Sequence, residues 1–445
     1  MTNHFRTKGN AWALIPLFIF IFTFLGAGIW LNDFYAFPSP VAVVLGIIAA
    51  FILYKSSTDA KVETLIAGCG ESKIMTMCLI YLLAGAFAVV SKAMGGVDAV
   101  VSLGINNIDV AYFPLGIFLI AAFLSTATGT SVGAIVAIGP IAVSLATSSG
   151  ASLPLIAGAL LGGSMLGDNL SMISDTTIAA TQSLGTDLKD KFKINLFIAF
   201  PAAIITILLF FYLGLNSDIT AVPIAKTDFE WIAIVPYVLV IVLALVGVNV
   251  FTTLVIGTIA AGLIGLYGNH FTVMEFTQKI YEGFTSMTEI FLLSMLSGGL
   301  AAMVDKAGGI DYILYQIKRR IKSKKSAQMG IGTLVGLTNL AIANNTVSIV
   351  ITGTIAKEIN DEYDLNPKKT AAILDIFSCV IQGILPYGAQ VLLILSFADG
   401  KLDFFDLIGN AFYHLFLLLF TVVAIYAGFW DKLVHRYFNY KLPVF

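Results

Sequence analysis

The sequence contains little charge for its length. Asp, Glu, Lys and Arg make up 12% of its 445 residues, whereas soluble domains carry about 25%. Apolar residues make up 58%, so too little polar surface remains to cover a globule in water. The formal net charge of −2 gives no reason to expect a nucleic-acid partner. This composition predicts a protein embedded in the lipid bilayer.

Cysteine and histidine are also scarce. The three cysteines, Cys69, Cys78 and Cys379, lack metal-ligand spacing and are interpreted as small reduced residues in apolar segments. The four histidines form no His-x-x-x-His pair. No HExxH motif or Ser/His pair occurs at membrane depth, so the sequence argues against an enzyme and predicts no cofactor.

Long apolar stretches account for most of the chain. About ten of them approach the roughly 20 residues that span a bilayer as a helix. They are residues 11–31, 38–54, 74–91, 153–184, 194–215, 231–247, 250–267, 284–304, 370–397 and 405–429. Two further stretches, 112–149 and 327–358, are interrupted by small and polar residues near their middles. We therefore expect an all-α, multi-pass membrane protein.

The two interrupted stretches could each cross the membrane completely or form a re-entrant hairpin. Basic residues in loops favour the cytoplasmic side. With two hairpins and a cytoplasmic N-terminus, all but four of the 25 lysines and arginines lie inside, the exceptions being Lys92, Lys226, Lys279 and Lys401. This bias favours the hairpins, and it predicts an inner (plasma) membrane protein with both termini in the cytoplasm.

The chain contains an internal repeat. At a constant shift of 214 residues, Lys92-Ala93 match Lys306-Ala307, Gly139 matches Gly353 and Ser164 matches Ser378. The predicted topology puts Lys92 outside and Lys306 inside, so the halves are inverted, as in alternating-access transporters. The predicted division is a scaffold of N-terminal helices (1–70), repeat 1 (71–215, hairpin 112–149, broken helix 153–184), connecting helices (216–283), repeat 2 (284–430, hairpin 327–358, broken helix 370–397) and a cytoplasmic tail (431–445).

Polar residues inside the spanning segments mark a candidate cation and proton site, because a carboxylate at the bilayer centre costs about 2.5–3.5 kcal/mol on insertion scales. The first-half candidates are Asp168, Asn169, Ser171, Ser174, Asp175, Thr176 and Thr177. In an unbroken helix Asp168 and Asp175 would lie about 20° apart on one face. A carboxylate, hydroxyls and exposed carbonyls suit Na⁺, and a buried carboxyl can also carry a proton. The sequence therefore predicts sodium at an Asp168/Asp175 cluster, although these residues could also cap a helix.

The second half and the hairpin tips supply further candidates. The second-half candidates are Asp375, Ser378, Gln382, Tyr387 and Gln390, and the tip candidates are Thr126, Thr128, Thr130, Ser131, Asn344, Asn345 and Thr346. The 214-residue shift puts Gln382 opposite Asp168. Asp375 is either an ionisable partner or a water-facing residue near the cytoplasmic end. The tip residues either contact the ion or serve turn geometry.

The run GDNLSMISDTT at 167–177 resembles the GD-x-x-S-P-x-SDTT signature of NhaC-type sodium/proton antiporters, and ILPYGAQ at 384–390 is similar to the second broken-helix motif of that family. Met172 stands where proline is usual, and Asn169 where lysine is common. More distantly, the layout resembles the ion transporter superfamily. These resemblances imply a homodimer with a scaffold and a sliding transport domain.

These observations predict a secondary transporter that exchanges Na⁺ for H⁺. The family resemblance leaves a second hypothesis open, a Na⁺- or H⁺-coupled carrier of a small organic acid or amino acid. No arginine lies inside a predicted span to bind a carboxylate, but helix ends in the hairpins could bind it instead. A gated channel would instead pass currents too large for a stepwise exchanger.

Overall fold

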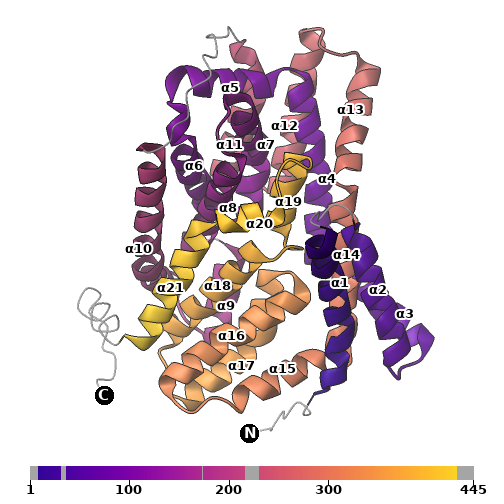
Figure 1. Cartoon of the computed structure of the whole chain (residues 1–445), viewed down its shortest axis with the longest axis vertical. Coiled ribbons are helices and arrows are strands. Elements are labelled where there is room, and N and C mark those ends of the chain that lie inside the picture. The colour runs from indigo at the N-terminus through magenta and orange to yellow at the C-terminus, as the bar shows by residue number, and fades with distance from the viewer. Residues whose placement is uncertain (1–8, 32–36, 173, 216–229, 428–445) are drawn as a thin grey trace.

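A computed structural model describes residues 9–31, 37–172, 174–215 and 230–427 (Figure 1). Within these ranges every regular element is a helix. Eight helical segments are long and apolar enough to cross a membrane, and four shorter apolar helices accompany them. The expectation of an all-α, multi-pass membrane protein is confirmed.

The described residues up to 215 form ten α-helices and two short 3₁₀ turns. They are η1 Ala11–Leu14, α1 Ile15–Leu31, α2 Ser39–Leu53, α3 Thr58–Cys69, α4 Ser72–Ala93, α5 Gly96–Asn107, η2 Val110–Tyr112, α6 Phe113–Thr128, α7 Ser131–Ser149, α8 Leu153–Leu170, α9 Asp175–Leu184 and α10 Leu188–Leu215.

The second half continues with eleven α-helices and one 3₁₀ turn. They are η3 Trp231–Ile234, α11 Val235–Leu245, α12 Val250–Tyr267, α13 Val273–Ser286, α14 Thr288–Lys306, α15 Gly309–Lys318, α16 Lys324–Ile342, α17 Asn345–Glu362, α18 Pro367–Ile384, α19 Ala389–Ala398, α20 Phe404–Gly409 and α21 Phe412–Tyr426.

Most of the helices pack in two groups, and α5 and α15 each contact both. The first, here called the frame, comprises α1–α4 and α11–α14. Glycines bring its helices into backbone contact: a Cβ on Gly85 of α4 would lie 2.1 Å from the carbonyl oxygen of Gly283 of α13, and one on Gly68 of α3 would lie 2.6 Å from that of Gly298 of α14. In a lipid bilayer the hydrophobic effect does not drive helices together, so they associate through close packing, which small residues allow.

The second group, here called the core, comprises α6–α10 and α16–α21. Its two hairpins, α6–α7 and α16–α17, pack on the helix pairs α8–α9 and α18–α19. Gly163 of α8 approaches the backbone of Phe118 of α6 closely, since a Cβ there would lie 2.3 Å from the Phe118 carbonyl oxygen. Residues buried in the core come from both halves of the chain, so neither half forms this group alone.

The helix bounds repeat along the chain. Both bounds of α8 and both bounds of α9, each increased by 214, give the bounds of α18 and α19. The hairpin tips agree at the same shift, because Gly129 and Ala343 both adopt the left-handed conformation, with φ of 72° and 56°. The next residues, Thr130 and Asn344, then cap the following helix by accepting from the backbone N–H three residues on.

Tertiary hydrogen bonds repeat at this shift too. Ser125 of α6 donates to the carbonyl oxygen of Ser164 of α8 at 2.6 Å. Asn339 of α16 donates to the carbonyl oxygen of Ser378 of α18 at 2.9 Å. The same helix pair is therefore tied at the same place in each half, as expected for a structural repeat.

The correspondence also reaches the helices before 71 and 284. Helix α3 packs on α14, and α13, which follows α3 by about the same shift, packs on α4. This reciprocal packing relates α3 to α13, while the division of the chain into a scaffold and two repeats stays a prediction. The opposite membrane orientation of the repeats and the re-entrant character of the hairpins stay predictions, and the expected tail at 431–445 lies outside the described residues.

Candidate functional site

The first helix break lies between α8 and α9. Helix α8 ends at Leu170 without a proline, and Ser174 caps α9 by accepting from the Thr177 backbone N–H at 3.1 Å. The Thr177 hydroxyl donates to the Ser171 carbonyl oxygen at 2.9 Å. Side chains therefore satisfy the backbone groups that the break frees, which irregular backbone at membrane depth requires.

The second break lies between α18 and α19, at Leu385–Gly388. Pro386 has no N–H to continue the helix. The Tyr387 hydroxyl donates to the Leu340 carbonyl oxygen at 2.6 Å, and the Gln382 amide donates to that of Ala343 at 3.3 Å. Both bonds tie this break to the tip of the α16–α17 hairpin.

Asp168 lies at the centre of the core, 5% exposed, on the last turn of α8. Its carboxylate accepts from the Ser131 hydroxyl at 2.7 Å and from the Ser131 backbone N–H at 3.4 Å. Ser131 is the first residue of α7, and the N-terminus of a helix favours negative charge.

A chain of side chains connects this carboxylate to the other half of the protein. Gln390 of α19 donates to the Ser131 hydroxyl oxygen at 3.0 Å, and Gln382 of α18 donates to the Gln390 amide oxygen at 3.1 Å. The buried Gln382 amide oxygen accepts no hydrogen bond. Both hairpin tips and both helix breaks therefore meet around one carboxylate, with hydroxyl and amide oxygens beside it.

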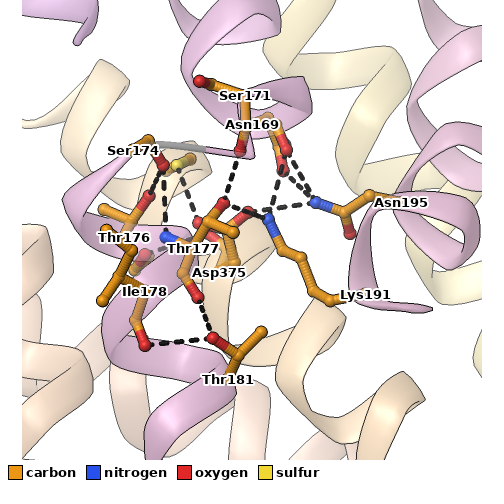
Figure 2. A network of polar contacts seen from close by, with 12 residues as sticks. Asn169, Ser171, Ser174, Thr176, Thr177, Ile178, Thr181, Lys191, Asn195 and Asp375 are labelled. Carbon is orange, nitrogen blue, oxygen red and sulfur yellow. Dashed lines mark hydrogen bonds and ion pairs between the residues drawn. The ribbon is translucent and has the colours of Figure 1, made fainter. Parts of the chain in front are cut away.

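A second polar cluster lies nearby and contains a buried ion pair (Figure 2). The Lys191 ammonium on α10 lies 2.5 Å from a carboxylate oxygen of Asp375 on α18, and both side chains are 0% exposed. The same ammonium donates to the Thr177 hydroxyl at 2.6 Å and to the Asn169 carbonyl oxygen at 3.2 Å. Asn195, one helical turn after Lys191, donates to Asp375 at 3.0 Å.

The structure separates the two aspartates that the sequence places on one helical face. Because the helix breaks between them, Asp175 begins α9 with its side chain 72% exposed and pairs with Lys73 of α4 at 3.3 Å. Asp168 instead bonds Ser131. The 20° estimate assumed an unbroken helix, and the break removes that geometry.

The other first-half candidates divide between the break and the Lys191 cluster. Asn169, Ser171 and Thr177 bond within or beside this cluster. The Ser174 and Thr176 hydroxyls bond each other at 2.9 Å. These five residues are buried and surround the first break.

The tip and second-half candidates separate in the same way. Thr126 and Ser378 donate to backbone carbonyls of their own helices, while Thr130 and Asn344 cap helices. The Thr128 hydroxyl donates to the Thr130 carbonyl oxygen, and the Thr346 backbone N–H donates to the Asn345 side chain. Seven candidates therefore serve local geometry through these contacts. Ser131, Gln382 and Gln390 reach Asp168 directly or through one another, while Tyr387 ties the second break to a hairpin.

The sequence-based interpretation missed Lys191. It counted this residue with Lys189 and Lys193 among cytoplasmic charges, but α10 begins at Leu188 and buries Lys191 completely. Asn195 is the residue that could have indicated this burial. It follows Lys191 by four residues, on the same helical face, and lies inside an apolar stretch. Asp375, for which two interpretations were open, is the buried partner of this lysine.

Comparison with known families gives a match over almost the whole chain. The model of the Na⁺/H⁺ antiporter family matches residues 9–215 and 216–430. The chain belongs to this family. It is a polytopic secondary transporter, and the NhaC-type resemblance is confirmed.

Three relatives show the range of this antiporter family. The malate-2H⁺/Na⁺-lactate antiporter of Bacillus subtilis is 26% identical, covering 78% of this chain and 79% of that protein. The Na⁺/H⁺ antiporter NhaC of the same organism is 25% identical, covering 82% and 85%. The arginine/ornithine antiporter ArcD of Halobacterium salinarum is 24% identical, covering 85% and 84%.

Proposed function

We propose that this protein exchanges Na⁺ for H⁺ across the inner membrane, with Asp168 as the carboxylate that binds either ion. The observation that carries the proposal is the meeting of both helix breaks at one buried carboxylate, 2.7 Å from the Ser131 hydroxyl. Family membership supports the same exchange. Na⁺ and H⁺ are then the coupling ions, and no cofactor is required.

The oxygens around Asp168 suit a small hard cation. The carboxylate, the Ser131 hydroxyl and the amide oxygens of Gln382 and Gln390 are ligands of the hard type. The Gln382 amide oxygen has no hydrogen-bond donor to lose when an ion binds. A carboxylate that is protonated no longer carries the negative charge that binds Na⁺, so the two ions compete for it. That competition couples their movements.

The division into frame and core supports an elevator-type movement within alternating access. Glycine-mediated backbone contacts join helices within each group. Between the groups lies a crevice of about 490 Å³, lined on the frame side by residues including Glu71 and Ala302 and on the core side by Ile342, Val347 and Ile351. The apolar residues that flank the tip of the second hairpin would slide along this wall. In this proposal the frame also provides the contacts of a homodimer, and both termini face the cytoplasm.

A Na⁺- or H⁺-coupled carrier of a small organic acid or amino acid is the second candidate, supported by two relatives that are named as antiporters of organic acids and of amino acids. An organic anion would bind a positive side chain or a helix N-terminus in the core, and the N-terminus of α7 already faces the Asp168 carboxylate. The Lys191 ammonium is buried there but contacts Asp375, so it offers no open charge to a substrate carboxylate. This geometry favours the inorganic cation.

The deciding experiment is dequenching of a pH-sensitive dye in proteoliposomes on addition of NaCl, LiCl, KCl or choline chloride. Exchange predicts a response to Na⁺ or Li⁺ that Asp168→Asn abolishes and Asp175→Asn retains. If folded wild-type protein responds to none of these salts, the proposal fails, and a screen of carboxylates and amino acids follows.

A further inference from the structure

The buried ammonium of Lys191 lies in a nest of oxygens that a metal cation could also use. An ammonium group has three hydrogens to donate. Here they meet three oxygens of different kinds: the Asp375 carboxylate at 2.5 Å, the Thr177 hydroxyl at 2.6 Å and the Asn169 backbone carbonyl at 3.2 Å. We refer to these three oxygens as the Lys191 cage.

The cage has the construction of a cation site in a transporter. One oxygen carries a full charge, and another is a carbonyl on the last turn of α8, where the helix breaks. Carbonyls at such breaks and helix C-terminal ends coordinate Na⁺ in other transporters. Beside the cage, the Asn195 side chain presents its nitrogen to the Asn169 carbonyl oxygen at 2.8 Å and to Asp375 at 3.0 Å. Its oxygen is buried and accepts no hydrogen bond, so a half-turn of the amide would supply one further oxygen ligand.

Other buried lysines of the described residues are held differently. The Lys61 ammonium donates to the Phe51 carbonyl oxygen near the end of α2, and that of Lys369 donates to the Ala424 carbonyl oxygen near the end of α21. Lysines commonly bond the last carbonyls of helices in this way. The Lys191 ammonium lies against a carboxylate and a hydroxyl as well as a carbonyl, so helix capping alone does not explain its position.

We propose that the Lys191 cage is a second cation site, which the protein keeps filled with its own ammonium group. Lys191 then occupies the place of a second Na⁺ and neutralises Asp375. Of the two buried carboxylates among the described residues, Asp375 is then neutralised, and, building on the exchange proposed above, Asp168 is left to bind an exchangeable Na⁺. Each chain therefore binds one Na⁺, and the charge moved per step is set at Asp168 alone.

Removing the ammonium group tests this proposal. Radioactive ²²Na⁺ binding at equilibrium is measured on purified full-length protein in detergent. Lys191→Met empties the cage but leaves Asp375 charged, and the amount of Na⁺ bound at saturation should double relative to wild type. Two control variants should bind the same amount of Na⁺ as wild type. Lys191→Arg keeps a positive charge in the cage, and the double variant Lys191→Met/Asp375→Asn leaves no negative charge in the cage to attract Na⁺.

The outcomes separate this proposal from the exchange function. Wild-type protein that binds no Na⁺ contradicts the function proposed for Asp168. Wild-type protein that binds one Na⁺, with a Lys191→Met variant that also binds one, overturns the second site and makes the ion pair purely structural. If Lys191→Met folds only in high NaCl, and not in high choline chloride, the cage takes Na⁺. If it fails to fold in both salts while the double variant folds, the cage does not take Na⁺ and the proposal falls.

Discussion

The close contact between α8 and α6 beside Asp168 predicts that a Gly→Ala substitution there is destabilising. Gly167 precedes Asp168 on α8 and faces α6, and a Cβ added there would lie 2.4 Å from the Ala122 carbonyl oxygen and 2.5 Å from the Ser125 Cβ. In an open helical position, Gly→Ala stabilises by roughly 1 kcal/mol through helix propensity. At Gly167 we expect the opposite result.

The size of the displacement follows from these distances. Moving the Ala122 oxygen from 2.4 Å to an ordinary contact near 3.4 Å requires α6 to shift by about 1 Å, and such overpacking costs about 1–3 kcal/mol. Helix α6 leads directly into the hairpin tip that carries Ser131. If the tip follows, the 2.7 Å bond from Ser131 to Asp168 lengthens to roughly 3.7 Å, beyond hydrogen-bonding distance.

Gly167→Ala should therefore raise the Km for Na⁺ in dye-dequenching assays and lower the thermal midpoint of the purified protein. Gly116→Ala is the matched control, because Gly116 lies on α6 and a Cβ there meets nothing within 4 Å. A Gly167→Ala variant with the Km and thermal midpoint of Gly116→Ala would refute the idea that this contact sets the Asp168 geometry.

Three further substitutions test the site. Asp168→Asn should abolish Na⁺-dependent dequenching, because an amide neither titrates nor attracts a cation with full charge; retained exchange would place the carrier elsewhere. Asp175→Asn should retain exchange and change stability by less than about 1 kcal/mol, since its pair with Lys73 is exposed; loss of exchange would return Asp175 to the ion site. Ser131→Ala should raise the Km for Na⁺ several-fold with little change in protein yield, because it removes one oxygen ligand and the bond to Gln390; an unchanged Km would exclude the hydroxyl as a ligand.

The helix breaks show how far local sequence carries the prediction. Pro386 and the glycine of the ILPYGAQ run predict a break in the helix near residue 386, and α18 ends at Ile384. The first break has Met172 where proline is usual in the family, yet α8 ends at Leu170. There Ser174 supplies a cap, which is a local signal that sequence analysis can recognise.

The partners of each charge depended on tertiary structure. Lys191 belongs to a run of lysines at the start of an apolar stretch, where the ordinary expectation is a solvated end. Its burial depends on α18 bringing Asp375 to within 2.5 Å. This contact joins residues 184 positions apart in the chain, so it depends on how the helices pack. The periodicity of α10 shows which face of the helix carries Lys191, but not which residue that face contacts. The exposure of Asp175 has the same origin, because the geometry of the break reorients α9.

The matching bounds of α8–α9 and α18–α19 bear on how the two halves arose. A duplicated ancestor would inherit two copies of each residue, yet Asp168 corresponds to Gln382 and Ser131 to Asn345 at the 214-residue shift. The backbone bounds of these helices thus match while the side chains around Asp168 differ. In the proposed exchange, one carboxyl therefore serves both halves of the chain, and Gln382 supplies a neutral oxygen at the matching position.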